Sequence, residues 1–499
     1  MTPLDLATYR TRAEEFLGGL NKEEYEHFSG QKETCDFTAI YERYPELFTR
    51  AAVDELNALY ETARDDEKRR LAYLLAATVG LYMGEQTKSL ADELANEESK
   101  ATIEVDGDKV PFRYSSVVQS NERDRDRREH IQRARLAVIE TVLTPRCDTL
   151  TCQAHDLARG LGYAHYKALF AEVKGIDYDL LRAQTDAFLQ DTESLYERVM
   201  DKLVRAKMGF GLCELRFSDL PYLWRAPEYD PIFSADRLLP TLTRMLADMG
   251  IDLAAQTNVH VDAEPRELKS PRAFCAPVRV PKEIYLVVMP KGGQDDYGAL
   301  LHEAGHTEHF AHVGPDLAFE YRHLGDNAVT EAYAFLFDHL TSNARWLDVY
   351  LDCADAGEFI TFANVQDLYL LRRYAGKLAY ETRLHEQTGS LDGMATVYSE
   401  CLSAATMVDV PACNYLVDVD DGFYCASYLR AWMFEGALRM MLQDRHGMEW
   451  FRDATAGAWV KELWSHGQHF TAEQLLLKYG GGRLDTDPLK HHLERALGR

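Results

Sequence analysis

The sequence LLHEAGHTEHF, from Leu300 to Phe310, contains two histidines four residues apart, with a glutamate directly after the first. On an α-helix, residues four apart lie on one face, so the imidazoles of His302 and His306 can face one ion. Glu303 lies beside them, where its carboxylate can reach a water molecule bound to that ion. Zinc prefers imidazole nitrogen and carboxylate oxygen, and catalytic zinc sites keep one position open for water. The apolar neighbours indicate a largely buried helix, in which histidines need partners. We therefore predict a metal site here.

Two residues are candidates for the third ligand. His312 has the position of the last histidine in the pattern HExxHxxGxxH, but that pattern needs a glycine at position 309 to break the helix, and this chain has His309 there. On an unbroken helix His312 would be rotated by about 120° from His306. Glu331 lies in DNAVTEAYAFLFDHL, which is apolar almost throughout and starts with capping residues. An ionised carboxylate is costly there unless it is paired or binds a metal, so we predict Glu331 as the third ligand.

Asp338 lies seven residues after Glu331 and therefore on the same face of this second helix. Its carboxylate can orient a ligating histidine without touching the metal. A buried structural acid is the alternative.

The rest of the chain indicates a mainly α-helical protein. Hydrophobic residues make up 46% of the 499 residues, enough for a sizeable core. Two regions differ: residues 101–116 alternate around Asp106-Gly107, which is typical of a β-hairpin, and residues 259–288 hold β-branched and aromatic runs typical of a small sheet. Apolar residues recur at helical spacing in Ala51–Arg64, Glu129–Leu143, Leu180–Lys207 and Pro240–Met249.

Composition excludes several partners and favours one compartment. The formal net charge of -26 argues against nucleic acid and against an anionic membrane surface, both of which attract clustered Lys and Arg. The first residues do not have the pattern of a signal peptide. The longest apolar stretch of the whole sequence is too short to cross a bilayer. The nine cysteines form no CxxC pair. We expect a soluble, reduced, cytoplasmic protein, and its oligomeric state cannot be predicted.

The motifs resemble those of the thimet oligopeptidase and oligoendopeptidase F family of zinc metallopeptidases. The resemblance rests on HEAGHTEH, on a glutamate 25 residues after the second histidine, and on the upstream RAFC; it is specific over Lys269–Glu435. His309 fits that family's HExGHxxH, and Asp338 matches an acidic position seven residues after the third ligand. A more distant resemblance, through Glu331-Ala332, links the chain to angiotensin-converting enzyme and carboxypeptidase Taq.

The resemblance implies a prolate helical fold with a deep central cleft, one zinc ion at its floor and one small β-sheet near the active site. The substrates would be short peptides. On this basis we expect residues 1–235 to form one side of the cleft and residues 236–499 to form the catalytic part. An edge strand around Ala273–Ala276, including Phe274, would either pair with the peptide backbone or serve only the structure.

The family places tyrosine hydroxyls over the scissile carbonyl. Tyr424 and Tyr428, four apart in DDGFYCASYLRAWMFEGALRMM, align with two of them, and Glu435 aligns with a family acid. Their hydroxyls would stabilise the oxyanion, whereas a purely structural aromatic stripe is the alternative. The chain departs from the family at Val419, where a histidine is usual, and at Ala431, where a further tyrosine is usual.

Three functions remain open from the sequence. The first is an endo-acting oligopeptidase in which Glu303 is the general base. The second is a carboxypeptidase of the same fold, for which Arg272, Arg322 and Arg430 are candidate anchors of the peptide carboxylate. The third is a metal-dependent amide hydrolase that does not act on peptides, or a metal-binding scaffold, although the scaffold would not need Glu303.

Overall fold

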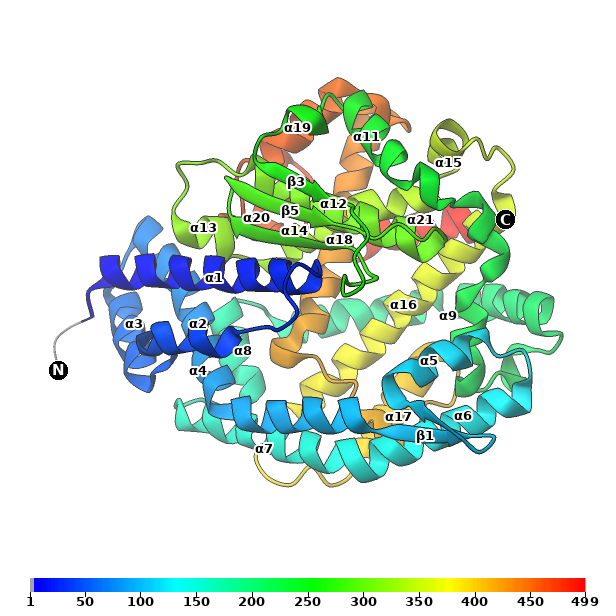
Figure 1. Cartoon of the computed structure of the whole chain (residues 1–499), viewed down its shortest axis with the longest axis horizontal. Coiled ribbons are helices and arrows are strands. Elements are labelled where there is room, and N and C mark those ends of the chain that lie inside the picture. Colours follow the sequence, from blue (N-terminus) through cyan, green and yellow to red (C-terminus); the bar gives the residue numbers. More distant parts are fainter. Residues whose placement is uncertain (1–3, 499) are drawn as a thin grey trace. The chain divides into compact units, whose positions relative to one another are not determined.

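The computed structural model describes residues 4–498, and within this range the protein is mainly α-helical, as expected (Figure 1). Contacts group the chain into two compact units. The first unit comprises Met1–Tyr82, Pro227–Ile360 and Arg430–Leu489, and the second comprises Met83–Ala226, Thr361–Leu429 and Lys490–Arg499. Each unit thus combines segments that are distant in sequence, and the roles expected for residues 1–235 and 236–499 stay predictions.

The α-helices of the first unit are α1 (Leu6–Phe28), α2 (Phe37–Arg43), α3 (Arg50–Thr62), α11 (Leu238–Asp248), α12 (Gln294–His312), α13 (Phe319–His323), α14 (Asn327–Asp338), α15 (Ala344–Leu351), α19 (Ala454–Trp464) and α20 (Ala472–Tyr479). Those of the second are α5 (Phe112–Asn121), α6 (Arg125–Val138), α7 (Thr144–Gly160), α8 (Tyr166–Lys174), α9 (Tyr178–Met208), α10 (Leu220–Arg225) and α17 (Met394–Thr406). Four helices contribute residues to both units: α4 (Asp65–Lys100), α16 (Gly357–Leu384), α18 (Tyr424–His446) and α21 (Asp487–Leu497). None of the described helices has the length and hydropathy needed to cross a bilayer.

Both expected β regions are present. In the second unit, β1 (Thr102–Val105) and β2 (Asp108–Pro111) form an antiparallel hairpin. Asp106 and Gly107 have positive φ at its turn, which Asp and Gly tolerate best. In the first unit, β3 (Val259–Asp262), β4 (Phe274–Arg279) and β5 (Glu283–Val287) form a sheet in the order β3-β5-β4. In this sheet β3 is parallel and β4 antiparallel to β5.

The three-stranded sheet lies between two helices of the first unit. On one face, Tyr25 of α1 packs with Ala276 and Val287. On the other face, Ile284 packs with Val313 and Phe310, at the end of α12. The sheet therefore fixes α12, the helix that carries the histidine motif.

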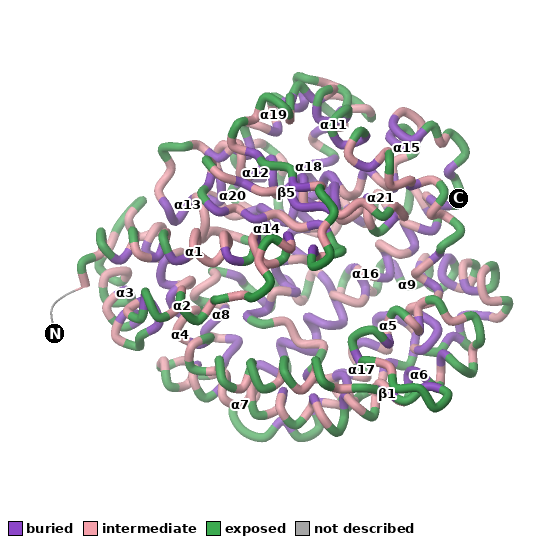
Figure 2. The backbone as a smooth tube through the Cα atoms, viewed as in Figure 1, coloured by how far each residue is buried: buried purple, intermediate pink, exposed green. Residues whose placement is uncertain are grey.

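Helices α12 and α14 pack closely together, and α14 is buried along most of its length (Figure 2). Gly305 of α12 faces the backbone of α14: a Cβ atom at Gly305 would lie 2.6 Å from both the Ala334 Cα and the Tyr333 carbonyl oxygen. Only glycine permits this approach. The motif therefore depends on Gly305 for the distance between the two helices.

We expect Gly305→Ala to destabilise the protein by about 1–3 kcal/mol, because the extra methyl group has only rigid backbone to displace. Gly298→Ala is the matched control on the same helix, since its Cβ would meet nothing within 4 Å. The control should be neutral or stabilising by up to about 1 kcal/mol, because alanine favours the helix. Urea unfolding of the two variants measures the difference, and equal midpoints would contradict the close contact.

Candidate metal centre

The two histidines of the motif are positioned by the local structure of α12. The carboxylate of Asp296, in its first turn, accepts hydrogen bonds from the N–H groups of Lys291 and Gly292 at 2.8 and 2.9 Å, which fixes the loop leading into the helix. The helix then continues without a break to its end at residue 312. The rings of His302 and His306 lie one turn apart, with centroids 4.9 Å apart.

Glu331 faces these two rings from α14. This helix begins where the Asp326 carboxylate accepts a hydrogen bond from the N–H of Ala328, as expected for a capping residue. The Glu331 Oε2 atom lies 3.4 Å from Nε2 of His302 and 3.6 Å from Nε2 of His306. One ligand atom from each of the three residues lies within 4.8 Å of the other two. Two imidazoles and one carboxylate in this arrangement have the chemistry of a catalytic zinc site.

The second nitrogen of each imidazole has its own partner. Nδ1 of His302 lies 2.9 Å from Oδ2 of Asp338, and Nδ1 of His306 lies 2.9 Å from the hydroxyl of Thr330. Both rings therefore turn Nε2 toward Glu331. The Asp338 contact is the one that the sequence suggested; Thr330 was not anticipated.

The electrostatics of the group also suit a cation. Burial lowers the pKa of His302, but hydrogen bonds to Asp338 and Glu331 outweigh it and raise this pKa to about 10. Glu303 adds further negative charge. Surroundings that favour a proton on an imidazole to this extent also favour a divalent cation in its place, since metal and proton compete for the same lone pair.

Glu303 lies on α12 but outside the three-residue group. Its Oε2 atom accepts a hydrogen bond of 2.9 Å from the backbone N–H of Cys275 on β4. The strand thus fixes Oε2 of Glu303, and Oε1 takes no part in this hydrogen bond. This contact could not be predicted from the sequence, because it depends on how β4 packs against α12.

His312 and His309 do not join the ligand group. Nδ1 of His312 lies 2.9 Å from the carbonyl oxygen of Glu308, as its position on an unbroken helix suggests. His309 is completely buried, and its Nδ1 lies 3.1 Å from the Thr330 hydroxyl. Burial lowers the pKa of His309 to about 3, so this imidazole is neutral. The sequence left open whether His309 supports a metal ligand or binds substrate, and its complete burial favours the supporting role.

The edge of β4 offers few backbone groups to a peptide. Ala273 directly precedes this strand, and Phe274 begins it and packs with Tyr25 on the face toward α1. The N–H of Cys275 is occupied by Glu303, and Pro277 has no N–H. Pairing with a peptide is therefore restricted to the beginning of the strand.

Tyr424 and Tyr428 lie in the first two turns of α18, within the second unit, whereas the three candidate ligands belong to the first. Their ring centroids are 4.9 Å apart, and the ring of Tyr374 lies 5.7 Å from that of Tyr428. Directly before them, Gly422 and Phe423 both have positive φ, at 58° and 59°. For a bulky residue such as Phe423 this conformation is strained, and strained backbone often occurs at functional sites.

Glu435 lies further along α18, within the first unit, and its carboxylate forms an ion pair. Its Oε1 atom lies 2.8 Å from Nε of Arg439, and both side chains are buried. Burial raises the pKa of Glu435 to about 7 against the effect of Arg439. The pair neutralises a carboxylate that would otherwise be buried alone.

A second group of possible metal ligands, Glu381, Asp420 and Cys425, lies in the second unit. Lys377 already provides a cation there: its Nζ atom lies 2.7 Å from Asp420 and 3.8 Å from Glu381. The Cys425 thiol donates a hydrogen bond to Glu381 at 3.0 Å. Burial raises the pKa of this thiol well above its usual value, so it stays protonated beside Glu381. We interpret this group as a structural ion pair.

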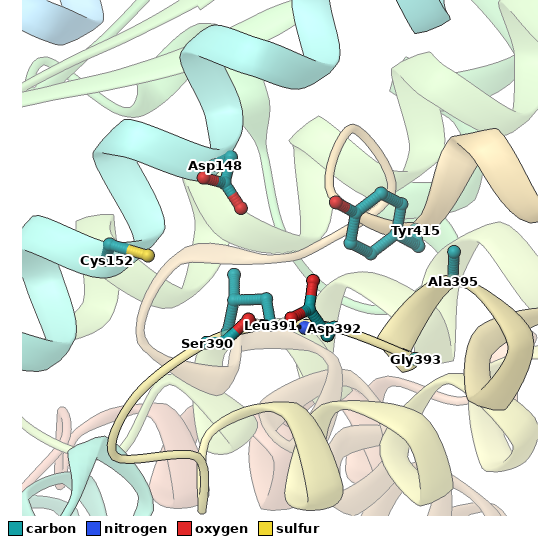
Figure 3. Close-up of a pocket in the computed structure, with 8 residues that line it drawn as sticks. All are labelled: Asp148, Cys152, Ser390, Leu391, Asp392, Gly393, Ala395 and Tyr415. Atoms are coloured by element: carbon teal, nitrogen blue, oxygen red, sulfur yellow. Dashed lines mark hydrogen bonds between the residues drawn. The ribbon is translucent and has the colours of Figure 1, made fainter.

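The second unit also contains a cavity of about 270 Å³ between α7 and the start of α17 (Figure 3). The side chains of Asp148, Asp392 and Tyr415 line it. It contains none of the residues that the sequence predicted as functional, and we assign it no role.

Comparisons with known proteins support the fold. No family model matches the chain, and no curated protein matches its sequence. Among solved structures, the chain is similar to a candidate oligoendopeptidase F from Bacillus anthracis strain Ames, with a TM-score of 0.63. The match has 15% identity and covers 95% of this chain and 84% of that one. The mainly α-helical oligoendopeptidase fold implied by the motifs is therefore confirmed, whereas the resemblance to angiotensin-converting enzyme and carboxypeptidase Taq remains a prediction.

We expect Glu331→Gln to weaken zinc binding strongly and His312→Ala to leave it almost unchanged. Glutamine keeps the size of Glu331 but removes the charge that faces both imidazoles. His312 instead lies beside Glu308 and the ring of Trp464, away from the ligand group. Titration of each purified variant with zinc against a chromophoric chelator measures the affinity. The opposite ranking would favour the three-histidine pattern.

Proposed function

We propose that this protein is a zinc-dependent metallopeptidase that binds one zinc ion per chain and hydrolyses peptide bonds in short peptides. The observation that carries the proposal is the convergence of His302, His306 and Glu331 with Glu303 beside them. The fold, shared with a candidate oligoendopeptidase F, supports the same class of reaction. The restriction to short peptides rests on the family resemblance.

Each of these residues has a different role in the proposed reaction. Bound zinc would lower the pKa of a coordinated water and polarise the scissile carbonyl. Glu303 takes the proton of the attacking water and delivers it to the leaving amine. The N–H of Cys275 holds one oxygen of Glu303, which leaves the other oriented for this transfer. Asp338 holds the ring of His302.

The hydroxyls of Tyr428 and Tyr424 are proposed to stabilise the negative charge that develops on the carbonyl oxygen. The strained turn at Gly422 and Phe423, directly before them, supports a functional role for the start of α18. The main chain around Ala273 and Phe274 is proposed to bind the peptide backbone.

The cysteines and the net charge support a proposed location and a proposed class of partner. All nine cysteines are free thiols, which supports a cytoplasmic location. The formal net charge of -26 argues against nucleic acid and anionic membranes, so short peptides are the proposed partners.

A carboxypeptidase of the same fold is the second candidate, and the structure reduces its possible anchors. Arg430 is buried and pairs with Asp326 and Glu473, so its charge is already compensated. Arg322 is bound to the carbonyl of Val280 and to Glu14. Arg272 is exposed and remains the candidate.

We expect hydrolysis of peptides whose two ends are blocked, because an endopeptidase does not need a terminal carboxylate. Mass spectrometry of the products from paired blocked and free peptides measures this. A carboxypeptidase would instead cleave only peptides with a free end and release one residue at a time. Loss of this cleavage in Arg272→Ala would favour that function. No cleavage of any peptide by the zinc-loaded protein would favour a metal-dependent amide hydrolase or a scaffold.

We expect Glu303→Gln to retain zinc but to lower peptide turnover by about 10²- to 10⁴-fold, because only the base is removed.

Tyr428→Phe should lower kcat by about 10²- to 10³-fold with a smaller change in KM, because its hydrogen bond matters most in the transition state. Tyr374→Phe, whose ring packs against Tyr428, is the matched control and should remain close to the parent. Parent-like turnover in Glu303→Gln would refute the mechanism. An unchanged kcat in Tyr428→Phe would refute only the catalytic role of α18 and would leave the metal site intact.

A further inference from the structure

The hydroxyl of Thr330 lies between two histidines of α12. It is 2.9 Å from Nδ1 of His306 and 3.1 Å from Nδ1 of His309. Thr330 directly precedes Glu331 on α14, and it is 7% exposed, whereas His309 is 0% exposed. Water therefore has little access to this contact, and each polar atom depends on protein partners.

The direction of these two hydrogen bonds follows from the proposed ligand set. Nε2 of His306 faces Glu331 and must offer its lone pair to a cation. A neutral imidazole with a free Nε2 carries its proton on Nδ1, so His306 donates to the Thr330 oxygen. The hydroxyl then has one proton to donate, and His309 Nδ1 is the acceptor within reach. The result is a chain of donors from His306 through Thr330 to His309.

The alternative, in which Nδ1 of His309 carries a proton, is less favourable. If His309 also donated to the hydroxyl, the proton of Thr330 would have no acceptor among the hydrogen bonds of the described residues. The chain instead places the His309 proton on Nε2. This atom makes no hydrogen bond within residues 4–498, and the backbone of Gly467 raises the pKa of the ring against the larger effect of burial.

We infer that Thr330 and His309 are positioning residues, which fix the ring orientation and the tautomer of His306 without touching the metal. The inference rests on the proposed function, because it takes His306 as a ligand. It also distinguishes the two histidine ligands. His302 is held by the carboxylate of Asp338, whereas His306 is held by a neutral hydroxyl that is itself held by a neutral imidazole. Partners of this kind affect metal affinity, because a ligand that must be oriented on binding loses part of its binding energy.

The test is a set of threonine variants in the full-length protein, with zinc affinity as the readout. Thr330→Val keeps the shape of the side chain but removes the hydroxyl, and we expect it to weaken zinc binding by about 10- to 100-fold. Thr330→Ser keeps the hydroxyl and should bind zinc within about threefold of the parent. Thr330→Ala replaces the valine variant if the latter does not fold. Competition with a chromophoric chelator gives each Kd, and thermal unfolding of the metal-free variants reports the fold separately.

Thr307→Val is the matched control. Thr307 is buried on α12 next to His306, but its hydroxyl donates to the carbonyl oxygen of Glu303 and forms no hydrogen bond with an imidazole of residues 4–498. This variant should retain the zinc affinity of the parent. The inference is overturned if Thr330→Val binds zinc as tightly as Thr330→Ser, or if Thr307→Val weakens binding equally. A parent protein that binds no zinc would instead refute the proposed function.

Discussion

The contact between α12 and α14 at Gly305 is the constraint on which the candidate metal centre depends. A helix has a backbone radius of about 2.3 Å, and ordinary side chains hold two helix axes about 8–10 Å apart. The Cβ position of Gly305 lies only 2.6 Å from the Ala334 backbone, so these helices approach more closely than side chains would allow. This approach brings a carboxylate on one helix within 3.4 and 3.6 Å of imidazoles on the other. A wider separation would leave the same three residues too far apart to share one ion.

The close approach has an electrostatic cost, because it buries charges in an apolar helix. The carboxylates at the two ends of α14 each have a hydrogen-bonded partner. Asp326 caps the helix and forms a two-pronged ion pair with Arg430. Burial raises the pKa of Asp326, but this arginine lowers it overall, so the cap stays ionised. Asp338 at the other end bonds His302. The remaining carboxylate, Glu331, faces the two imidazoles, where a divalent cation would balance its charge.

The sequence predicted the parts of this site that depend on local spacing. His302 and His306 are four residues apart, so any helix places them on one face, and Asp338 follows Glu331 by two helical turns. His312 could be set aside because no glycine breaks the helix. Contacts between distant segments could not be predicted. Nothing in the sequence around Thr330 indicates that it meets His306 and His309, because this depends on the relative rotation of two helices. The grouping of the chain into two discontinuous units was hidden for the same reason, since periodicity describes each helix but not its neighbours.

The small sheet has a role that a helix could not take. Backbone N–H groups inside a helix are bonded to the carbonyl four residues earlier, so a helix interior has none to offer to a carboxylate. An edge strand has every second N–H directed away from its neighbour. On β4 this group is the N–H of Cys275, and it binds Oε2 of Glu303. Pro277, two residues further along the same edge, has no N–H, and its carbonyl accepts a hydrogen bond from Asn21 of α1. The strand thus offers Glu303 one donor at one position, and the helices on both faces of the sheet keep that position fixed. A carboxylate held through one oxygen retains the other for the proton transfer that we propose for Glu303.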